Sequence, residues 1–281
     1  MSAREEIAAT PRAPVFGVGE LTERLIVEKQ GPIGWITFNN PARRNAISVD
    51  MWEAIPRALD RFAAEPEMRA IVLTGAGDKA FVSGADISQF DHARADSAGV
   101  QRYEEIAEGA QLRLQQCDVP VLAMIRGFCL GGGLNIALAS DLRIAADDAR
   151  LGIPAARLGL AYRASSTKNL VDTIGPANAR EVLLTGRQFD AEEALAMGLL
   201  NRVVPAAALE DSVLDYCALF ADNAPLTMRA AKRIIRELLK SHADFDAAAC
   251  RAFVQECFAS ADYAEGRRAF KEKRRPKFSG K

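Results

Sequence analysis

Short, almost wholly apolar runs alternate with longer amphipathic runs over the first 150 residues of the chain. The apolar runs at 69–77, 119–127 and 141–146 are predicted to be buried strands. The runs at 48–65 and 99–118 carry apolar residues at helical spacing and are predicted to be helices. Because strands and helices alternate, the sequence predicts a layered α/β fold.

Other parts of the chain do not follow this alternation of strands and helices. Residues 24–40 give two β-rich runs broken at Gly31 and Pro32, which predicts a hairpin. From residue 163 onward the chain reads as nearly all helix. Such a helical part is more often an oligomerisation or lid element than an independent domain. The N-terminal segment contains acidic residues and no apolar core, so we expect a loose arm rather than a signal peptide. We divide the chain into a flexible arm at 1–20, an α/β core at 21–205 and a helical oligomerisation or covering region at 206–281.

Charge and residue usage narrow the classes of partner. Lys and Arg number 36 against 37 Asp and Glu, so nothing global favours binding to nucleic acid or to a membrane. No apolar stretch is long enough to span a bilayer. Two histidines, His92 and His242, are too few and too scattered for a histidine-built metal site. The five cysteines form no C-x-x-C pair, so we expect reduced thiols and a cytoplasmic location.

Three consecutive glycines stand in "RGFCLGGGLNIALASDLRIA" (126–145), where a predicted strand ends and an apolar helix begins. The first N–H groups of a helix lack internal partners and carry the positive end of the helix dipole. Glycine allows a ligand atom to approach these groups closely, which favours a site for an anion or an oxyanion. Tight packing of the helix on a sheet is the alternative explanation of the triplet.

A second glycine-bearing turn follows another predicted strand, in "GAGDKAFVSGADISQF" (75–90). It is not a dinucleotide-binding fingerprint, because the third glycine of that motif is missing. Two exposed turns of this kind, each after a buried strand, can direct one N–H each at a single carbonyl oxygen. The pair therefore indicates a two-donor oxyanion hole.

These two segments resemble the signature segments of the crotonase superfamily, the enoyl-CoA hydratase/isomerase proteins. The resemblance extends, in order along the chain, to "NNPARRNAIS" (39–48), "LTGRQFDAEEALAMGLLNRVV" (184–204) and "SADYAEGRRAFKEKRRPKF" (260–278). It implies a crotonase-like fold of repeated ββα units with a helical C-terminal trimerisation region. It also implies a homotrimer or a hexamer built of two trimers, and an acyl-CoA thioester as the ligand.

The resemblance assigns site residues position by position. The oxyanion donors would be the backbone N–H groups of Ala85 and Gly132. The basic C-terminal segment would cover coenzyme A bound with a neighbouring subunit, because Lys and Arg neutralise phosphates. No metal is implied, and no cofactor apart from the coenzyme A of the substrate. The residues expected to bind substrate are Arg43, Asn45, Ala46, Ala85, Asp86, Ile87, Ser88, Gly131, Gly132, Ala155, Phe270 and Lys273.

The positions that carry the two glutamates of the family's hydratases hold other residues here. The first, three residues after the oxyanion glycine, is Asn135, and the second is Ala155. Neither side chain takes a proton at neutral pH. General acid–base help is worth ~10²–10⁴ in rate per group, so a standard hydratase mechanism is expected to be very slow.

Decarboxylation of a malonyl-type thioester needs the oxyanion hole and no base, so we expect a lyase of that type. The segment 157–170 resembles the methylmalonyl-CoA decarboxylase branch, which has a tyrosine at the position of Tyr162. That tyrosine would orient the leaving carboxylate or protonate the enolate, or it would simply form a wall of the pocket. The branch differs by keeping a glutamate at position 135 and a histidine at position 85. A slow or atypical hydratase or isomerase, and a silent acyl-CoA-binding protein, remain as alternatives.

Overall fold

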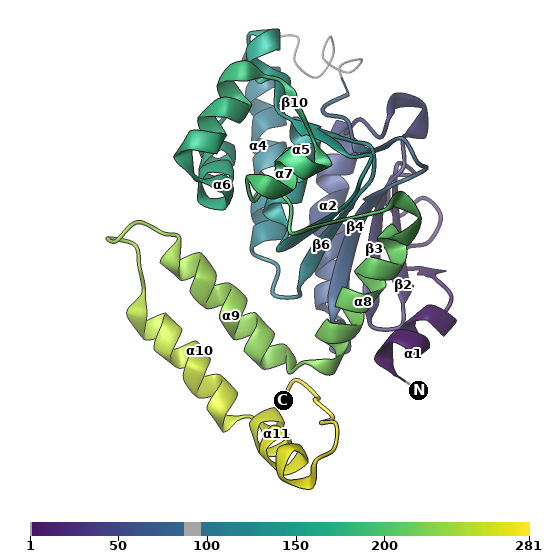
Figure 1. Ribbon diagram of the computed structural model, residues 1–281, viewed down its shortest axis with the longest axis vertical. Helices are drawn as coiled ribbons and strands as arrows, with labels where there is room; N and C mark the ends of the chain where they lie inside the picture. Colours follow the sequence, from purple (N-terminus) through teal and green to yellow (C-terminus); the bar gives the residue numbers. More distant parts are fainter. Residues whose placement is uncertain (1, 87–96) are drawn as a thin grey trace.

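A twisted sheet runs through the core of the computed structural model, which describes residues 2–86 and 97–281 (Figure 1). Its strand order is β1-β2-β3-β4-β6-β8-β11, antiparallel from β1 to β3 and parallel from β3 to β11. The predicted hairpin at 24–40 is the β2–β3 pair. The strands are β1 (Ala13–Pro14), β2 (Leu25–Gln30), β3 (Ile33–Phe38), β4 (Ala70–Gly75), β6 (Val121–Ile125), β8 (Leu142–Ala146) and β11 (Arg202–Val204).

Both faces of this sheet are covered, and the alternation of side chains along its strands explains why. In β3, Ile33 and Trp35 belong to one buried cluster while Ile36 and Phe38 belong to the other. Successive residues of a strand point to opposite faces, so a wholly apolar strand needs a cover on each side. This is why the central strands read as continuous apolar runs in the sequence.

Helices cover the larger cluster. α2 runs unbroken through Pro56, and Ala107 on α4 and Leu134 on α5 are buried against the same core. The helices of this layer are α2 (Val49–Ala63), α4 (Ser97–Gln115), α5 (Gly132–Ala139), α6 (Ala164–Thr185) and α7 (Ala191–Ala196), and the 3₁₀ turns of the chain are η1 (Pro41–Arg43), η3 (Pro154–Leu158) and η4 (Ala206–Ala208).

A second, four-stranded sheet was not expected from the sequence. Its order is β10-β9-β7-β5, and β5, β7 and β9 are parallel. Because β5 and β7 pair directly, the glycine-bearing turns that follow them lie next to each other. The strands are β5 (Ala80–Val82), β7 (Phe128–Leu130), β9 (Arg150–Gly152) and β10 (Gln188–Asp190).

The N-terminal segment differs from the loose arm that the sequence predicted. Helix α1 (Ala3–Ala9) begins with a capping box at Ser2, and β1 then pairs with β2. Ile7 is buried beside α8 (Leu209–Asp222), and Arg4 bonds Asp211 of α8 at 2.6 Å. Capping, burial and strand pairing each fix this segment against the second face of the sheet.

The C-terminal helices stand apart from the sheet (Figure 1). Helix α8, assigned above to the helical region, packs on the sheet, so the part that stands off begins at α9 (Pro225–Leu238). Helices α9 and α10 (Ala247–Ala259) lie side by side, and α11 (Ala261–Glu272) follows at the far end of the molecule.

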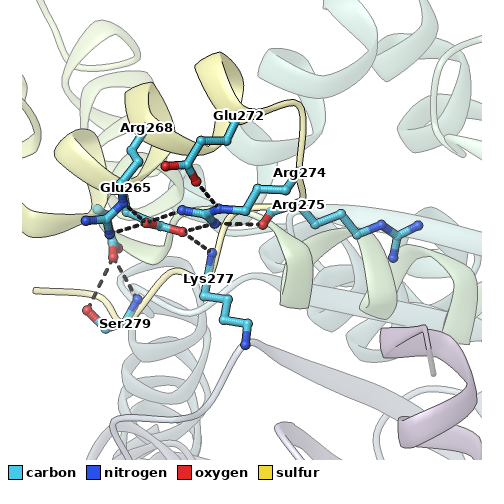
Figure 2. A network of polar contacts seen from close by, with 8 residues as sticks. Glu265, Arg268, Glu272, Arg274, Arg275, Lys277 and Ser279 are labelled. Atoms are coloured by element: carbon cyan, nitrogen blue, oxygen red, sulfur yellow. Dashed lines mark hydrogen bonds and ion pairs between the residues drawn. The ribbon is translucent and has the colours of Figure 1, made fainter.

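The basic segment after α11 is held by carboxylates of that helix (Figure 2). Arg274 Nη1 and the Lys277 N–H donate to Glu265 at 2.6 and 3.0 Å. The hydrogen bond from Arg274 has the largest effect on Glu265, followed by those from Arg268 and the Lys277 N–H. Together they hold the pKa of the Glu265 carboxyl well below its usual range. Part of the positive charge expected to meet phosphates is therefore paired within the chain.

Across the described residues, we find no helix that is both long and apolar enough to cross a membrane.

Candidate active site

Two of the three glycines at 131–133 are required by the backbone geometry. Gly131 precedes α5 with φ 51° and ψ −114°, a conformation that side chains of L residues rarely adopt. A Cβ on Gly133 would lie 2.0 Å from the Val82 carbonyl oxygen, so the helix packs directly on β5. A Cβ on Gly132 would meet only ordinary contacts, the nearest at 3.6 Å. Tight packing therefore explains Gly133 and leaves Gly132 unexplained.

The N–H groups of Gly132 and Ala85 are both unpaired. Within residues 2–86 and 97–281, neither group has a hydrogen-bond partner. The two turns approach closely, since a Cβ on Gly132 would lie 4.0 Å from the Ala85 nitrogen. Ala85 is held by a bridge to Ile47, in which the flanking Gly84 oxygen and Asp86 nitrogen bond Ile47 at 2.8 and 2.9 Å. The arrangement leaves two neighbouring donors available to one acceptor.

A cavity of about 220 Å³ opens beside these donors. Residues of α4, α5 and α6 form its walls together with η3 and the two glycine-bearing turns. The cavity brings together five predicted site residues other than Tyr162: Ala85, Gly131, Gly132, Asn135 and Ala155. Its other lining residues are Trp52, Ser83, Gly84, Tyr103, Glu104, Ala107, Gln111, Ile153, Pro154, Leu158, Leu160, Ala161, Tyr162, Arg163 and Ser166.

Asn135 takes part in a buried chain of hydrogen bonds. Its Nδ2 donates to Ser166 Oγ at 3.2 Å, and Ser166 Oγ donates to Gln111 Oε1 at 3.3 Å. The spacing of Asn135 from Gly132 identified it as a candidate in the sequence. Gln111 and Ser166 lie on helices that are distant from Asn135 in the sequence, and nothing in the sequence identified them. Only the packing of α4 and α6 around α5 brings the three together.

Tyr162 lines the cavity and donates its hydroxyl hydrogen to the Gly131 carbonyl oxygen at 3.1 Å. That carbonyl also accepts the Asn135 N–H at 3.1 Å. Burial raises the pKa of the Tyr162 phenol, so it stays neutral at physiological pH. A neutral phenol is a hydrogen-bond donor and does not act as a base.

The cavity contains one ion pair that the sequence did not reveal. Glu104 on α4 accepts from Arg163 Nε at 2.8 Å, and it is the single carboxylate among the described lining residues. Tyr103, Ala107 and Gln111 lie on the same face of α4, at spacings of four residues. That spacing was visible in the sequence, but it resembles any buried helix face.

The loop at 43–46 is bonded to the turn that contains Ala85, and two of its residues, Asn45 and Ala46, are buried. Arg43 Nη1 bonds the buried Asp86 carboxylate at 3.1 Å. The Asn45 side chain is buried, and it donates to the backbone oxygens of Ala76 and Ala80 at 2.9 and 2.8 Å. Ala46 is buried as well. Of these three residues, only Arg43 presents an exposed side chain to a ligand.

The remaining predicted residues lie elsewhere. Phe270 and Lys273 are on and directly after α11, at the opposite end of the molecule from α5 (Figure 1). Phe270 is 86% exposed, so within one chain it does not contribute to the cavity. Ile87 and Ser88 lie outside the described residues.

Comparisons with known proteins give matches over most of the chain. The model of the family described as enoyl-CoA hydratase/isomerase matches residues 28–281. A short-chain-enoyl-CoA hydratase of Clostridium acetobutylicum is 32% identical over 89% of this chain and 95% of its own length. A carnitinyl-CoA dehydratase of Citrobacter koseri is 33% identical over 93% of this chain and 100% of its own. The crystal structure of an enoyl-CoA hydratase/carnithine racemase from Magnetospirillum magneticum superposes with a TM-score of 0.85 at 34% identity, covering 92% of this chain and 97% of that one.

Proposed function

The chain belongs to the enoyl-CoA hydratase/isomerase family, and from that premise we propose that it stabilises the enolate of an acyl-CoA thioester with two backbone N–H groups. The donors are those of Ala85 and Gly132. The observation that supports this most directly is that both are unpaired, adjacent and at the edge of one cavity. Gly132 adds the positive end of the α5 dipole.

Removing one donor tests the proposal. Gly132→Pro deletes the N–H at the first position of α5, where proline is well tolerated. We expect turnover to fall by roughly 10²–10³, as for other oxyanion-hole donors. Gly132→Ala is the matched control, since it keeps the N–H and adds only a Cβ in ordinary contact. A folded Gly132→Pro enzyme that reacts as fast as wild type would disprove the assignment.

For the reaction itself we propose decarboxylation of a malonyl-type thioester. The carbon–carbon bond to the carboxylate breaks, CO₂ leaves, and its electron pair forms the enolate held by the two donors. A solvent proton then gives the saturated thioester. Asn135 and Ala155, at the positions expected for acid–base groups, support a reaction that needs no base. The test is release of CO₂ from methylmalonyl-CoA, which must exceed the rate in buffer.

Hydration or dehydration is the second candidate, favoured by two observations. The relatives above are named hydratase and dehydratase, and the cavity does contain one carboxylate, that of Glu104. In this reaction Glu104 would take the proton of the attacking water, and Glu104→Gln would abolish it. Loss of the ultraviolet absorbance of crotonyl-CoA measures the rate. Binding of thioesters without turnover of either substrate would instead identify a silent binding protein.

We also propose a cytoplasmic location and assembly into a trimer or a hexamer. The five cysteines are free thiols, which supports a reducing compartment. The position of Phe270 and Lys273, far from the cavity of their own chain, supports a contact with coenzyme A on a neighbouring subunit.

A further inference from the structure

Tyr103 on α4 lines the cavity and has no role in the enolate chemistry proposed above. Its side chain is buried, 8% exposed, and it forms part of the same wall as the two glycine-bearing turns. The hydroxyl oxygen accepts a hydrogen bond from Trp52 Nε1, on α2, at 3.0 Å. Helices α2 and α4 pack against each other, so tertiary packing fixes the position of this hydroxyl.

The indole ring of Trp52 links Tyr103 to the start of α5. A Cβ on Gly132 would lie 3.6 Å from Trp52 Cζ2, so one edge of the indole contacts this glycine. The Nε1 atom of the same ring bonds the Tyr103 hydroxyl, and in an indole Cζ2 and Nε1 are bonded to one common carbon. The hydroxyl of Tyr103 and the N–H of Gly132 therefore border the same part of the cavity.

The enolate needs a proton at its α-carbon, whether decarboxylation or addition of water forms it. Ala155, at the position of the second hydratase glutamate, has no acidic proton to give. Glu104 is paired with Arg163, and an ionised carboxylate only accepts. Tyr162 donates its hydroxyl hydrogen to the Gly131 carbonyl oxygen. In this arrangement none of these side chains directs an acidic hydrogen at the enolate.

We propose that Tyr103 is a catalytic residue that donates the proton to the α-carbon of the enolate. The inference rests on the proposed function, because it assumes that the thioester oxygen lies at Ala85 and Gly132. In this step the phenolic O–H bond breaks, and the electron pair of the enolate forms the new carbon–hydrogen bond. The thioester carbonyl is restored, and the phenolate oxygen that is left takes a proton from solvent.

The contact with Trp52 suits this role. A phenolic hydroxyl can accept one hydrogen bond and donate another, so the bond from Trp52 Nε1 does not use the hydroxyl hydrogen of Tyr103. The same N–H remains directed at the oxygen when that oxygen becomes negative. Hydrogen bonds to a charged acceptor are roughly twice as strong as bonds between neutral groups. The indole therefore stabilises the phenolate more than the phenol, which favours transfer of the proton.

The face of the enolate that receives the proton provides the test. Methylmalonyl-CoA is decarboxylated in D₂O, and the configuration of the singly deuterated α-carbon of propionyl-CoA is determined. A positioned acid is worth ~10²–10⁴ in rate, so the wild-type product should carry deuterium on one face by at least about a hundredfold. Tyr103→Phe removes only the hydroxyl, and its product should carry deuterium on both faces within about twofold, because water then supplies the proton. If the enzyme hydrates crotonyl-CoA instead, the α-carbon of that product gives the same readout.

Two further variants make the assignment specific. Tyr216→Phe, on α8 at the other face of the sheet, is the matched control and should keep the wild-type preference. Tyr103→Phe leaves the Trp52 N–H without its acceptor. If that variant does not fold, the double variant Trp52→Phe/Tyr103→Phe removes donor and acceptor together and takes its place.

Each outcome separates the inference from the proposed function. A full facial preference in Tyr103→Phe, or its loss in Tyr162→Phe instead, overturns the inference and leaves the proposed function standing. Equal labelling of both faces by the wild type also overturns it, because the proton then comes from free water. Turnover of neither ester overturns the proposed function itself, and the inference with it.

Discussion

One peptide unit, between residues 131 and 132, contributes to two features of the site. Its N–H is the unpaired donor of Gly132, and its carbonyl oxygen accepts from Tyr162. A hydrogen bond to a carbonyl polarises the peptide and makes its N–H a stronger donor. We infer from this contact that Tyr162 is a positioning residue for the proposed oxyanion hole; the roles expected from the sequence, as a group that orients the leaving carboxylate, as a proton donor or as a wall of the pocket, stay predictions.

Tyr162→Phe tests this role. Loss of one hydrogen bond, worth about 1 kcal/mol, should lower kcat by roughly fivefold and leave KM nearly unchanged. Steady-state kinetics on the best substrate measure both. Tyr216→Phe, on α8 at the other face of the sheet, is the control. A rise in KM of similar size, with kcat unchanged, would show that Tyr162 only forms a wall of the pocket.

At the scale of single residues, the structure shows where the predicted site residues lie, and their roles stay predictions. Backbone donors depend on glycine-bearing turns, and glycines can be recognised directly in the sequence. The positions of Ala85 and Gly132 could therefore be proposed. Asn45 was predicted to contact substrate, yet its amide cross-links the backbone at Ala76 and Ala80. Gln111 was missed because a buried glutamine on an apolar helix face has no signature of its own.

Among the elements, helix α9 is attached to the core mainly by charge. Arg233 Nη2 and Arg236 Nη2 bond the two oxygens of Asp118 at 2.5 and 3.2 Å. Burial alone would raise the pKa of the Asp118 carboxyl, but these two guanidinium groups outweigh burial and hold the pKa below its usual range. The helix buries only Leu226 and Ala230 within the chain.

Asp118→Asn should therefore lower Tm by about 2 °C at pH 7, equivalent to roughly 1 kcal/mol. The folded-state pKa lies below the unfolded value of about 3.9, so the contribution is complete above that pH. It is lost as the pH falls through the folded-state pKa, and the two melting curves should converge there. Calorimetry across this pH range measures the effect, with the exposed Asp78→Asn as control. A constant difference down to low pH would contradict the ionic attachment.

The sequence predicted the long central strands and missed the short strands of the second sheet, and the difference has a physical reason. Strands β3, β4 and β6 are buried on both faces, and their apolar runs identified them. Strands β5, β7, β9 and β10 have three residues each, and only their pairing partners make them strands. The N-terminal helix escaped prediction because its stability comes from its cap and from Ile7 packing on α8.

For the whole molecule, the C-terminal helices leave an apolar groove uncovered. It encloses about 790 Å³ between α9, α10 and α11, and Phe258 and Phe270 are 61% and 86% exposed beside it. Apolar patches of this kind mark interfaces in soluble proteins. This agrees with the trimer or hexamer expected from the sequence, which stays a prediction.

Phe258→Asp should shift the protein toward smaller species, because a buried carboxylate opposes association. Light scattering after size exclusion measures the molar mass. Leu184→Asp changes an exposed apolar residue of α6 outside the groove and should leave the mass unchanged. A wild-type protein that elutes as a monomer would contradict the prediction outright.

The unequal demands on the three glycines at 131–133 have a consequence for how the site tolerates change. In a saturation library scored separately for soluble yield and for turnover, Gly131 and Gly133 variants should lose yield, the first through its positive φ and the second through collision with Val82. Gly132→Ala should keep both soluble yield and turnover. Gly132→Pro should keep soluble yield and lose turnover. Such a result would show that Gly131 and Gly133 are needed for folding, while the N–H of Gly132 is needed for the proposed chemistry.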